Sequence, residues 1–239
     1  MLDSLILSPT DFAALAYFLA AWLVHGLAAS GRLVSRVSLS QAMNAQRAAW
    51  MRGMARRELR MIDTGIMVGL QQGTAFFASS SLIALGGCFA LLNASAQVAQ
   101  IVADMPYAGP YSRQAYEIKV FGLIAILAYS FFKFGWSYRL FNYCSILIGA
   151  VPMASDPGYE PKEIWAAADR AARMNMLAGS HFNSGLRGIF FSIGYLGWFI
   201  NPLVFALTTS LLLAVLVRRQ FFSEARLVAL SEGSRGIGD

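Results

Sequence analysis

Four long apolar runs dominate the pattern of hydrophobic and polar positions along the chain. They cover residues 12–29, 65–92, 117–151 and 188–217. A helix needs roughly 20 apolar residues to cross the hydrocarbon core of a bilayer. The runs therefore predict an all-α, polytopic transmembrane helical bundle of about four spans, folded as a single membrane domain over residues 1–239.

The third and fourth runs are longer than one crossing requires. As helices rising 1.5 Å per residue they would reach about 45–50 Å, against a core of about 30 Å. Pro202, which follows Asn201, lacks a backbone donor and can kink the fourth run. Each run can thus be a tilted, protruding or kinked helix, or can contain a re-entrant segment. We expect one crossing from each; a fifth crossing hidden in either would reverse the side of the C-terminus.

The distribution of cations predicts the orientation of the chain. Seven arginines lie between the first two runs: Arg32, Arg36, Arg47, Arg52, Arg56, Arg57 and Arg60. The loop 94–116 has only Arg113. Cytoplasmic loops carry the excess of Lys and Arg, so we expect the N-terminus to be periplasmic. Four crossings also place the C-terminus outside, a placement with which Arg218 and Arg219 conflict.

The segment 38–61 has the pattern of a basic amphipathic cytoplasmic helix. Arg52, Arg56 and Arg60 repeat every four residues, and Met51 and Met54 supply apolar surface. Such a helix lies on the membrane interface or docks against other helices. The three arginines are our predicted contacts with anionic lipid headgroups.

Composition supports a bilayer as the surrounding solvent. The chain is 57% hydrophobic and 13% charged, whereas soluble domains carry about 25% charged residues. Its pI of about 9.6 is explained by cytoplasmic arginines, and we expect no nucleic-acid partner. Cys88 and Cys144 lack the spacing of a metal site. We expect a multi-pass protein of the bacterial inner membrane.

Gly65, Gly69 and Gly73 form a row of small residues four apart. Residues at this spacing share one helix face, where a second backbone can approach closely. Packing between two helices of one subunit is slightly favoured. The alternatives are an oligomer interface or a pore-lining helix.

Lys133 and Arg139 interrupt the third run. Charges inside a membrane span are costly and often functional. The ordinary interpretation is that both side chains reach the cytoplasmic interface or form structural pairs. The alternative is an anion- or headgroup-contacting site formed together with Arg187.

Motifs for catalysis are missing from the sequence. It contains no nucleophile triad, phosphate loop or zinc motif. His25 and His181 could in principle ligate a b-type haem, but nothing else supports that ligation, and a core histidine is the ordinary interpretation of His25. We expect a protein that is not an enzyme and holds no cofactor or metal.

Three stretches carry a resemblance to a known family. They are LRMIDTGIMVGLQQGTAFFASSSLIALGG (59–87), FKFGWSYRLFNYCSILIGAVP (132–152) and NSGLRGIFFSIGYLGWFINP (183–202). They resemble the bacterial and plant membrane proteins catalogued as domain of unknown function 599. The resemblance implies an integral membrane fold with about four helices. It implies no activity, substrate or catalytic residue.

The resembling stretches also contain most of the polar residues near the long runs. Arg139, Asn142 and Tyr143 share one helix face and could meet residues that precede the fourth run. The predicted polar cluster is Lys133, Arg139, Asn142, Tyr143, Asn183 and Arg187. It is either a site or a hydrogen-bonded clasp between two helices.

Two functions are consistent with these sequence features. The first is a homo-oligomeric channel- or transporter-like protein that favours anions, because the spans hold cations and few acids. The second is a non-catalytic subunit, scaffold or assembly factor of a larger membrane complex. A lipid-active enzyme is a weaker third hypothesis, since the spans offer neither a nucleophile nor metal-binding carboxylates.

Overall fold

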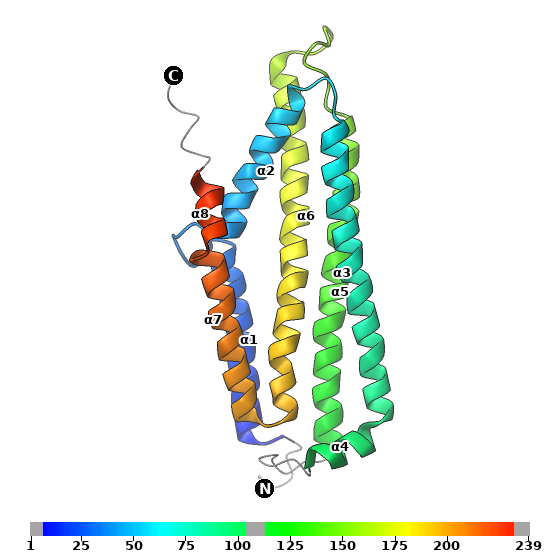
Figure 1. Ribbon diagram of the computed structural model, residues 1–239, viewed down its shortest axis with the longest axis vertical. Helices are drawn as coiled ribbons and strands as arrows, with labels where there is room; N and C mark the ends of the chain where they lie inside the picture. Colours follow the sequence, from blue (N-terminus) through cyan, green and yellow to red (C-terminus); the bar gives the residue numbers. More distant parts are fainter. Residues whose placement is uncertain (1–6, 104–112, 232–239) are drawn as a thin grey trace.

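The computed structural model describes residues 7–103 and 113–231, and within these ranges the chain is helical with no strand. The elements are α1 (Pro9–Ala29), α2 (Leu39–Ala55), α3 (Met61–Asn93), α4 (Ser95–Ala103), α5 (Arg113–Gly149), α6 (Pro161–Tyr195), the 3₁₀ turn η1 (Leu196–Phe199), α7 (Pro202–Phe221) and α8 (Glu224–Ser231). Figure 1 shows them as one elongated bundle. The predicted all-α helical bundle is confirmed.

Four segments of the bundle are long and apolar enough to cross a membrane: Pro9–Ala29, Met61–Asn93, Arg113–Gly149 and Pro202–Ser231. Large apolar side chains on them face outward. On α3, for example, Phe76 is 66% exposed and Ile83 is 76% exposed. A bilayer covers such surfaces, so the chain is a multi-pass membrane protein.

The helices begin at side-chain caps that the sequence supplies. Ser8 and Asp11 form a capping box at the start of α1, and Ser38 does the same with Gln41 at the start of α2. These side chains satisfy backbone N–H groups that a helix start leaves without partners. Pro9, Pro161 and Pro202 each occupy a first turn, where their missing N–H costs nothing.

The predicted fourth span, 188–217, is wrong as a single element. Its first part is the end of α6, and its second part is α7, which runs back after the turn η1. Asn201 adopts an extended backbone, and its Oδ1 accepts a hydrogen bond from the Val204 N–H at 2.8 Å. Asn201 is therefore an N-cap, so Pro202 starts a helix where the sequence suggested a kink.

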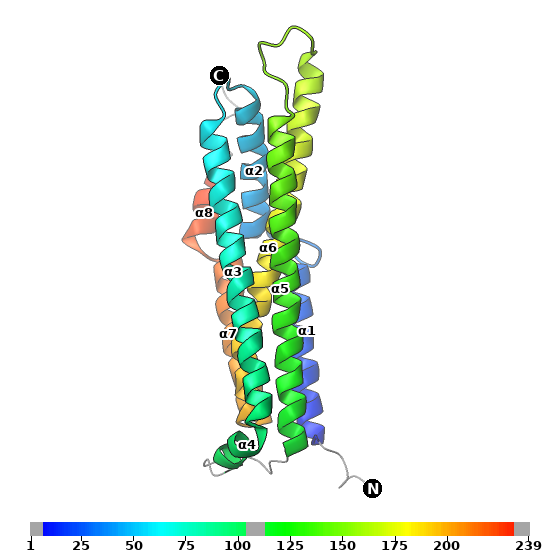
Figure 2. The ribbon, with the colours of Figure 1, turned by 90° about the vertical axis from the view of Figure 1, so that its right-hand side faces the viewer.

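The consequence is a different path for the end of the chain. α6 starts at the end of the bundle that holds α2 and finishes at the end where α1 begins, and α7 returns beside α1 (Figures 1 and 2). α8 then lies against α2, where Gln46 Nε2 donates to the carbonyl of Ala229 at 3.0 Å. α8 lies in the same half of the bundle as α2, so the predicted placement of the end of the chain opposite the arginine-rich loop is wrong. Arg218 and Arg219 no longer conflict with that loop.

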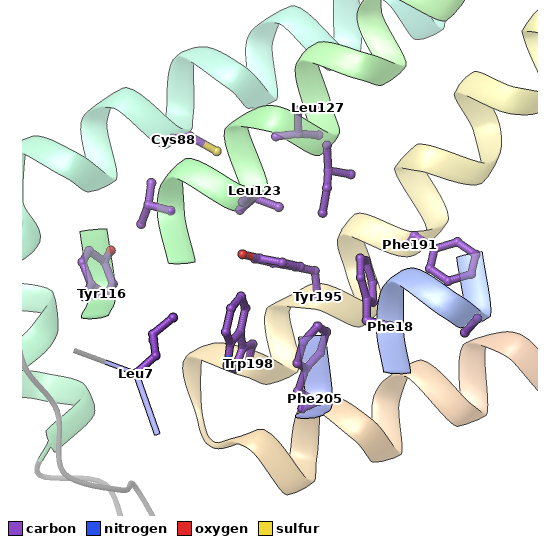
Figure 3. Close-up of a cluster of buried hydrophobic side chains, with 14 of the residues drawn as sticks. Leu7, Phe18, Cys88, Tyr116, Leu123, Leu127, Phe191, Tyr195, Trp198 and Phe205 are labelled. Atoms are coloured by element: carbon purple, nitrogen blue, oxygen red, sulfur yellow. The ribbon is translucent and has the colours of Figure 1, made fainter. Parts of the chain in front are cut away.

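Two hydrophobic cores fill the bundle. The first mixes aliphatic and aromatic side chains and includes the turn after α6, where Trp198 stacks on Phe205 with ring centroids 5.2 Å apart (Figure 3). The second joins α2 to α5 and α6 and contains the fully buried Met51 and Met54. Because α2 buries these methionines in the bundle, it docks against other helices instead of lying flat on the membrane.

Candidate functional site

The structure divides the predicted polar cluster between two places. Arg139 lies on the outside of α5, where its Nε donates to the Tyr143 hydroxyl at 2.6 Å and its guanidinium lies 5.9 Å from the Trp136 ring centre. Trp136 is 46% exposed. Lys133 lies 5.4 Å over the Tyr129 ring, and Asn142, half-buried on the same helix, is likewise no part of the cavity described next. Exposed aromatics beside cations are typical of a membrane interface.

Asn183 and Arg187, the two members on α6, line a cavity between α1, α2, α6 and α7. Its volume is about 240 Å³. The polar residues that line it are His25, Ser40, Arg47, Asn183, Arg187, Arg219 and Gln220. We call it the arginine cavity. The predicted six-residue clasp between α5 and α6 is wrong, because these two residues face α1, α2 and α7 instead of the outer face of α5.

Ser40 connects the helices around the arginine cavity. Its Oγ accepts hydrogen bonds from Gln220 Nε2 at 2.7 Å and from Asn183 Nδ2 at 3.4 Å. These bonds join α2 to α7 and to α6. The polar wall is thus held by side chains from three helices, which fixes the position of the cavity.

Arg47 reaches the cavity from α2. Its Nη1 donates to Asn44 Oδ1 at 3.0 Å. The guanidinium packs against the backbone of α6 at Gly179. A Cβ added to Gly179 would lie only 2.6 Å from Arg47 Cζ. Burial lowers the pKa of Arg47 from its usual value, but a guanidinium keeps its charge in proteins. A fixed positive charge therefore stands at this wall.

Arg187 brings a buried donor without a partner, and His25 brings a buried ring beside it. Arg187 Nη2 donates to Ser184 Oγ at 3.0 Å, while its buried Nε has no hydrogen-bond partner in the described part of the chain. Both ring nitrogens of His25 are buried, and neither completes a hydrogen bond there, although the backbone of Leu216 lies beside the ring. Buried polar atoms are normally paired. Where such an atom lines a cavity, there is room for water or a ligand to complete its hydrogen bonds.

Carboxylates are missing from the arginine cavity. Within residues 7–103 and 113–231, the five ion pairs involve Arg52, Arg57, Arg113, Lys119 and Lys162. The cavity arginines Arg47, Arg187 and Arg219 belong to none of them, and no acid lines the walls. Guanidinium groups bind carboxylate and phosphate oxygens with two parallel hydrogen bonds. The arrangement can bind an anion.

The opposite end of the bundle holds a buried ion pair. Lys119 Nζ lies 3.6 Å from Asp11 Oδ1 and donates to the carbonyl of Trp198 at 2.9 Å. The indole Nε1 of Trp198 donates to the same Asp11 oxygen at 2.6 Å. These contacts join α1 and α5 to the turn η1. Because Asp11, Lys119 and Trp198 satisfy one another, they stabilise this end of the bundle and do not form an open binding site.

The three arginines predicted to contact lipid headgroups each have a partner inside the chain. Arg52 pairs with Asp169 at 3.2 Å, and Arg56 lies 5.3 Å over the Trp165 ring. Arg60 donates to the carbonyls of Ile148, Val151 and Pro152 and so caps the end of α5. Their contact with headgroups stays a prediction.

The glycine row on α3 faces away from the rest of the chain. A Cβ on Gly65, Gly69 or Gly73 would meet nothing within 4 Å. The predicted packing of this row against another helix of the same subunit is wrong. Contact with a second subunit stays a prediction.

The sequence did not single out Ser40, Arg47, Arg219 or Gln220, and it treated His25 as a core residue. Arg219 could not be placed because the turn at η1, which brings α7 back to α2, was not recognised. The one available signal was Asn201-Pro202, the pattern of a helix start. His181 packs edge-on to Trp136 of α5 at 6.4 Å, whereas His25 lines the cavity, so the two histidines do not form a haem-ligating pair.

Comparison with known proteins agrees with the resemblance in the sequence. The model of a family described as "Protein of unknown function, DUF599" matches residues 13–225. No curated protein and no solved structure matches the chain. The match covers most of the chain, including every long helix of the bundle, and the chain therefore belongs to the DUF599 family.

Proposed function

We propose that this protein binds an anion in the arginine cavity and carries it as a transporter-like protein of the bacterial inner membrane. The observation that carries the proposal is the meeting of Arg47, Arg187 and Arg219 at one cavity, for which the described residues supply no carboxylate. Three positive charges in a partly buried place are unfavourable without a counter-charge. A bound anion supplies that charge and accepts a hydrogen bond from Arg187 Nε.

The distribution of charge supports a cytoplasmic position for the cavity. The arginines of α2 and its flanking loops lie in the same half of the bundle as the end of α7 and α8: Arg36 donates to the carbonyl of Phe221, and Arg226 donates to the carbonyl of Val37. In the described residues, the opposite end carries Arg113 and Lys119, both paired with acids. The positive-inside rule then favours α2 and α8 in the cytoplasm and the start of α1 in the periplasm, an orientation in which α6 also passes through the membrane beside the four apolar helices.

The shape of the bundle favours a carrier over a channel. The arginine cavity lies towards the end with α2, while the other end is closed by Asp11, Lys119 and Trp198 above an aromatic core. A carrier exposes its site to one side at a time, and a site between helices that is closed at the far end agrees with that behaviour. A homo-oligomer is part of the proposal, since the glycine row of α3 offers a face for a second copy.

Flux into liposomes tests the proposal. The purified full-length chain is reconstituted, and uptake of radioactive phosphate and sulfate is compared with protein-free vesicles. We expect uptake above leak for the wild type, loss of most of it in Arg187→Gln, and no change in Arg139→Gln, which removes a charge outside the cavity. Leak-level uptake of every anion by the wild type contradicts transport.

A non-catalytic subunit of a larger complex is the second candidate. It is favoured by the exposed face of α3, on which Gly65, Gly69 and Gly73 leave room for another backbone. Purification in mild detergent decides between the two. A stable stoichiometric partner supports the second candidate, and a homo-oligomer without partners counts against it.

A further inference from the structure

We infer that the anion taken by the arginine cavity is the phosphate of a lipid headgroup, bound together with the start of its apolar chain. The inference rests on the proposed anion binding and names the class of ligand. Three properties of the cavity support it: its level relative to the membrane, the mixture of side chains that line it, and the number of its positive charges and hydrogen-bond donors.

The depth of the cavity matches the headgroup layer. α1 has 21 residues and α7 has 20, so each is about 30 Å long, the thickness of the hydrocarbon core. The two helices lie side by side and set the position of the membrane (Figure 1). The cavity is lined by Ala29, the last residue of α1, and by Arg219 and Gln220 near the end of α7. Lipid phosphates lie just beyond the hydrocarbon core, at this level.

The lining suits a molecule with a charged head and an apolar chain. Beside the arginines, the walls contain Leu39, Met43, Leu186, Phe190 and Leu216. Arg219 itself stacks 5.6 Å over the Phe190 ring. A small soluble anion can reach the guanidinium groups but leaves these apolar walls uncovered, so it is expected to bind more weakly than an anion with an attached chain. A lipid presents its phosphate to the guanidinium groups and its acyl chain to the apolar wall.

The number of donors favours a doubly charged phosphate. Arg47, Arg187 and Arg219 bring three positive charges, and Arg187 Nε adds a buried donor without a partner in the described part of the chain. A phosphate monoester such as phosphatidic acid has three free oxygens and close to two negative charges. A diester such as phosphatidylglycerol has two free oxygens and one charge. We therefore expect the monoester to bind more tightly.

Binding to the full-length chain in neutral detergent tests the inference. The probes are dioctanoyl phosphatidic acid, dioctanoyl phosphatidylglycerol, dioctanoyl phosphatidylcholine, glycerol 3-phosphate and inorganic phosphate, titrated by microscale thermophoresis. We expect dioctanoyl phosphatidic acid to bind at least tenfold more tightly than glycerol 3-phosphate or inorganic phosphate. We expect phosphatidylglycerol between them and phosphatidylcholine last among the lipids.

Three variants locate the binding. Arg187→Gln is expected to weaken binding of dioctanoyl phosphatidic acid at least tenfold, and Arg139→Gln, which removes a surface charge on α5, is expected to leave it unchanged. Arg187→Lys retains the charge and serves if Arg187→Gln does not fold. It is expected to bind more weakly than the wild type, because an ammonium group cannot form the two parallel hydrogen bonds.

Each contrary result has a separate meaning. Equal affinity for inorganic phosphate and phosphatidic acid overturns the lipid and leaves anion binding standing. Equal affinity for phosphatidylcholine and phosphatidic acid, or binding that Arg187→Gln and Arg187→Lys do not change, overturns the lipid site in favour of the general membrane-facing surface. Failure of every probe to bind overturns both the inference and the proposed function.

Discussion

The guanidinium of Arg47 rests on the backbone of α6 at Gly179, at a distance that leaves no room for a side chain there. A Cβ at position 179 would lie 2.6 Å from Cζ and Nη1 and 2.7 Å from Nη2. α2 and α6 thus meet through an arginine and a glycine, and the glycine determines where one charge of the arginine cavity stands. A substitution at Gly179 can therefore move the charge of Arg47 without removing it.

Gly179→Ala is therefore expected to weaken anion binding without removing any charge. The added methyl group pushes the Arg47 guanidinium away from its place, and the flexible arginine can move, so the fold survives. We expect a loss of affinity of several-fold, measured by titration with the anion that binds the wild type.

Gly135→Ala is the matched control, because a Cβ on Gly135 of α5 meets nothing within 4 Å. Alanine favours a helix by roughly 0.5–1 kcal/mol over glycine, so this variant should fold at least as well and bind normally. Equal binding by both glycine variants would contradict the role assigned to Gly179.

Removing one cavity charge at a time should weaken binding at every position. Hydrogen bonds to charged groups contribute about 1.5–3 kcal/mol, which corresponds to about a 10- to 150-fold change in affinity. We expect Arg47→Gln and Arg219→Gln each to fall in this range in a titration by isothermal calorimetry. Loss from Arg47→Gln alone would place the anion against α2 only and contradict a cavity shared by three arginines.

The buried pair at the other end predicts a stability effect. Breaking such a pair on one side leaves an uncompensated buried charge and costs about 3–5 kcal/mol. We expect Asp11→Asn and Lys119→Met each to lower the free energy of unfolding in detergent by about this amount. The double variant should be more stable than the sum of the two losses predicts, because no lone charge remains.

A double-mutant cycle measures this coupling. Strict additivity of Asp11→Asn and Lys119→Met would show that the two side chains do not stabilise one another. Arg113→Gln is a suitable comparison, since its pair with Glu117 is exposed and pairs of that kind contribute about 0–1 kcal/mol.

The path of α6 and α7 predicts which residues can be labelled from each side. Leu59, between α2 and α3, and Val228 on α8 lie at one end and are exposed, whereas Ala96 on α4 lies at the other. With the native cysteines buried, Leu59→Cys and Val228→Cys should react with an impermeant thiol reagent only after the membrane is opened. Ala96→Cys should react in intact spheroplasts. Labelling of Val228→Cys together with Ala96→Cys would contradict the return of α7.

Much of the fold follows from the hydrophobic pattern. The first three runs correspond to α1, α3 and α5, because a mainly apolar run of that length crosses a bilayer most stably as a helix. The fourth run was predicted as a single helix because the turn between α6 and α7 is itself apolar. Leu196, Trp198 and Ile200 continue the apolar run after α6 ends at Tyr195. Only Asn201-Pro202 marks the new helix.

The candidate site could be predicted only in part. Arg187 was identified because a charge near an apolar run is costly, and Asn183 shared its stretch. Their partners could not be found from spacing, since Arg47 and Arg219 come from helices that meet only after α7 turns back. Arg139 and Tyr143 were joined to them by helix periodicity, which gives the shared face but not the direction in which that face points.

The most direct test of the anion site is a structure determined with selenate, a tetrahedral stand-in for phosphate whose selenium can be located by anomalous scattering. We expect a peak in the arginine cavity, within hydrogen-bonding distance of the Arg187 guanidinium and close to Arg47 or Arg219, and no such peak in Arg187→Gln. Selenate bound only at exposed arginines such as Arg139, with the cavity empty at saturating concentration, would contradict this expectation.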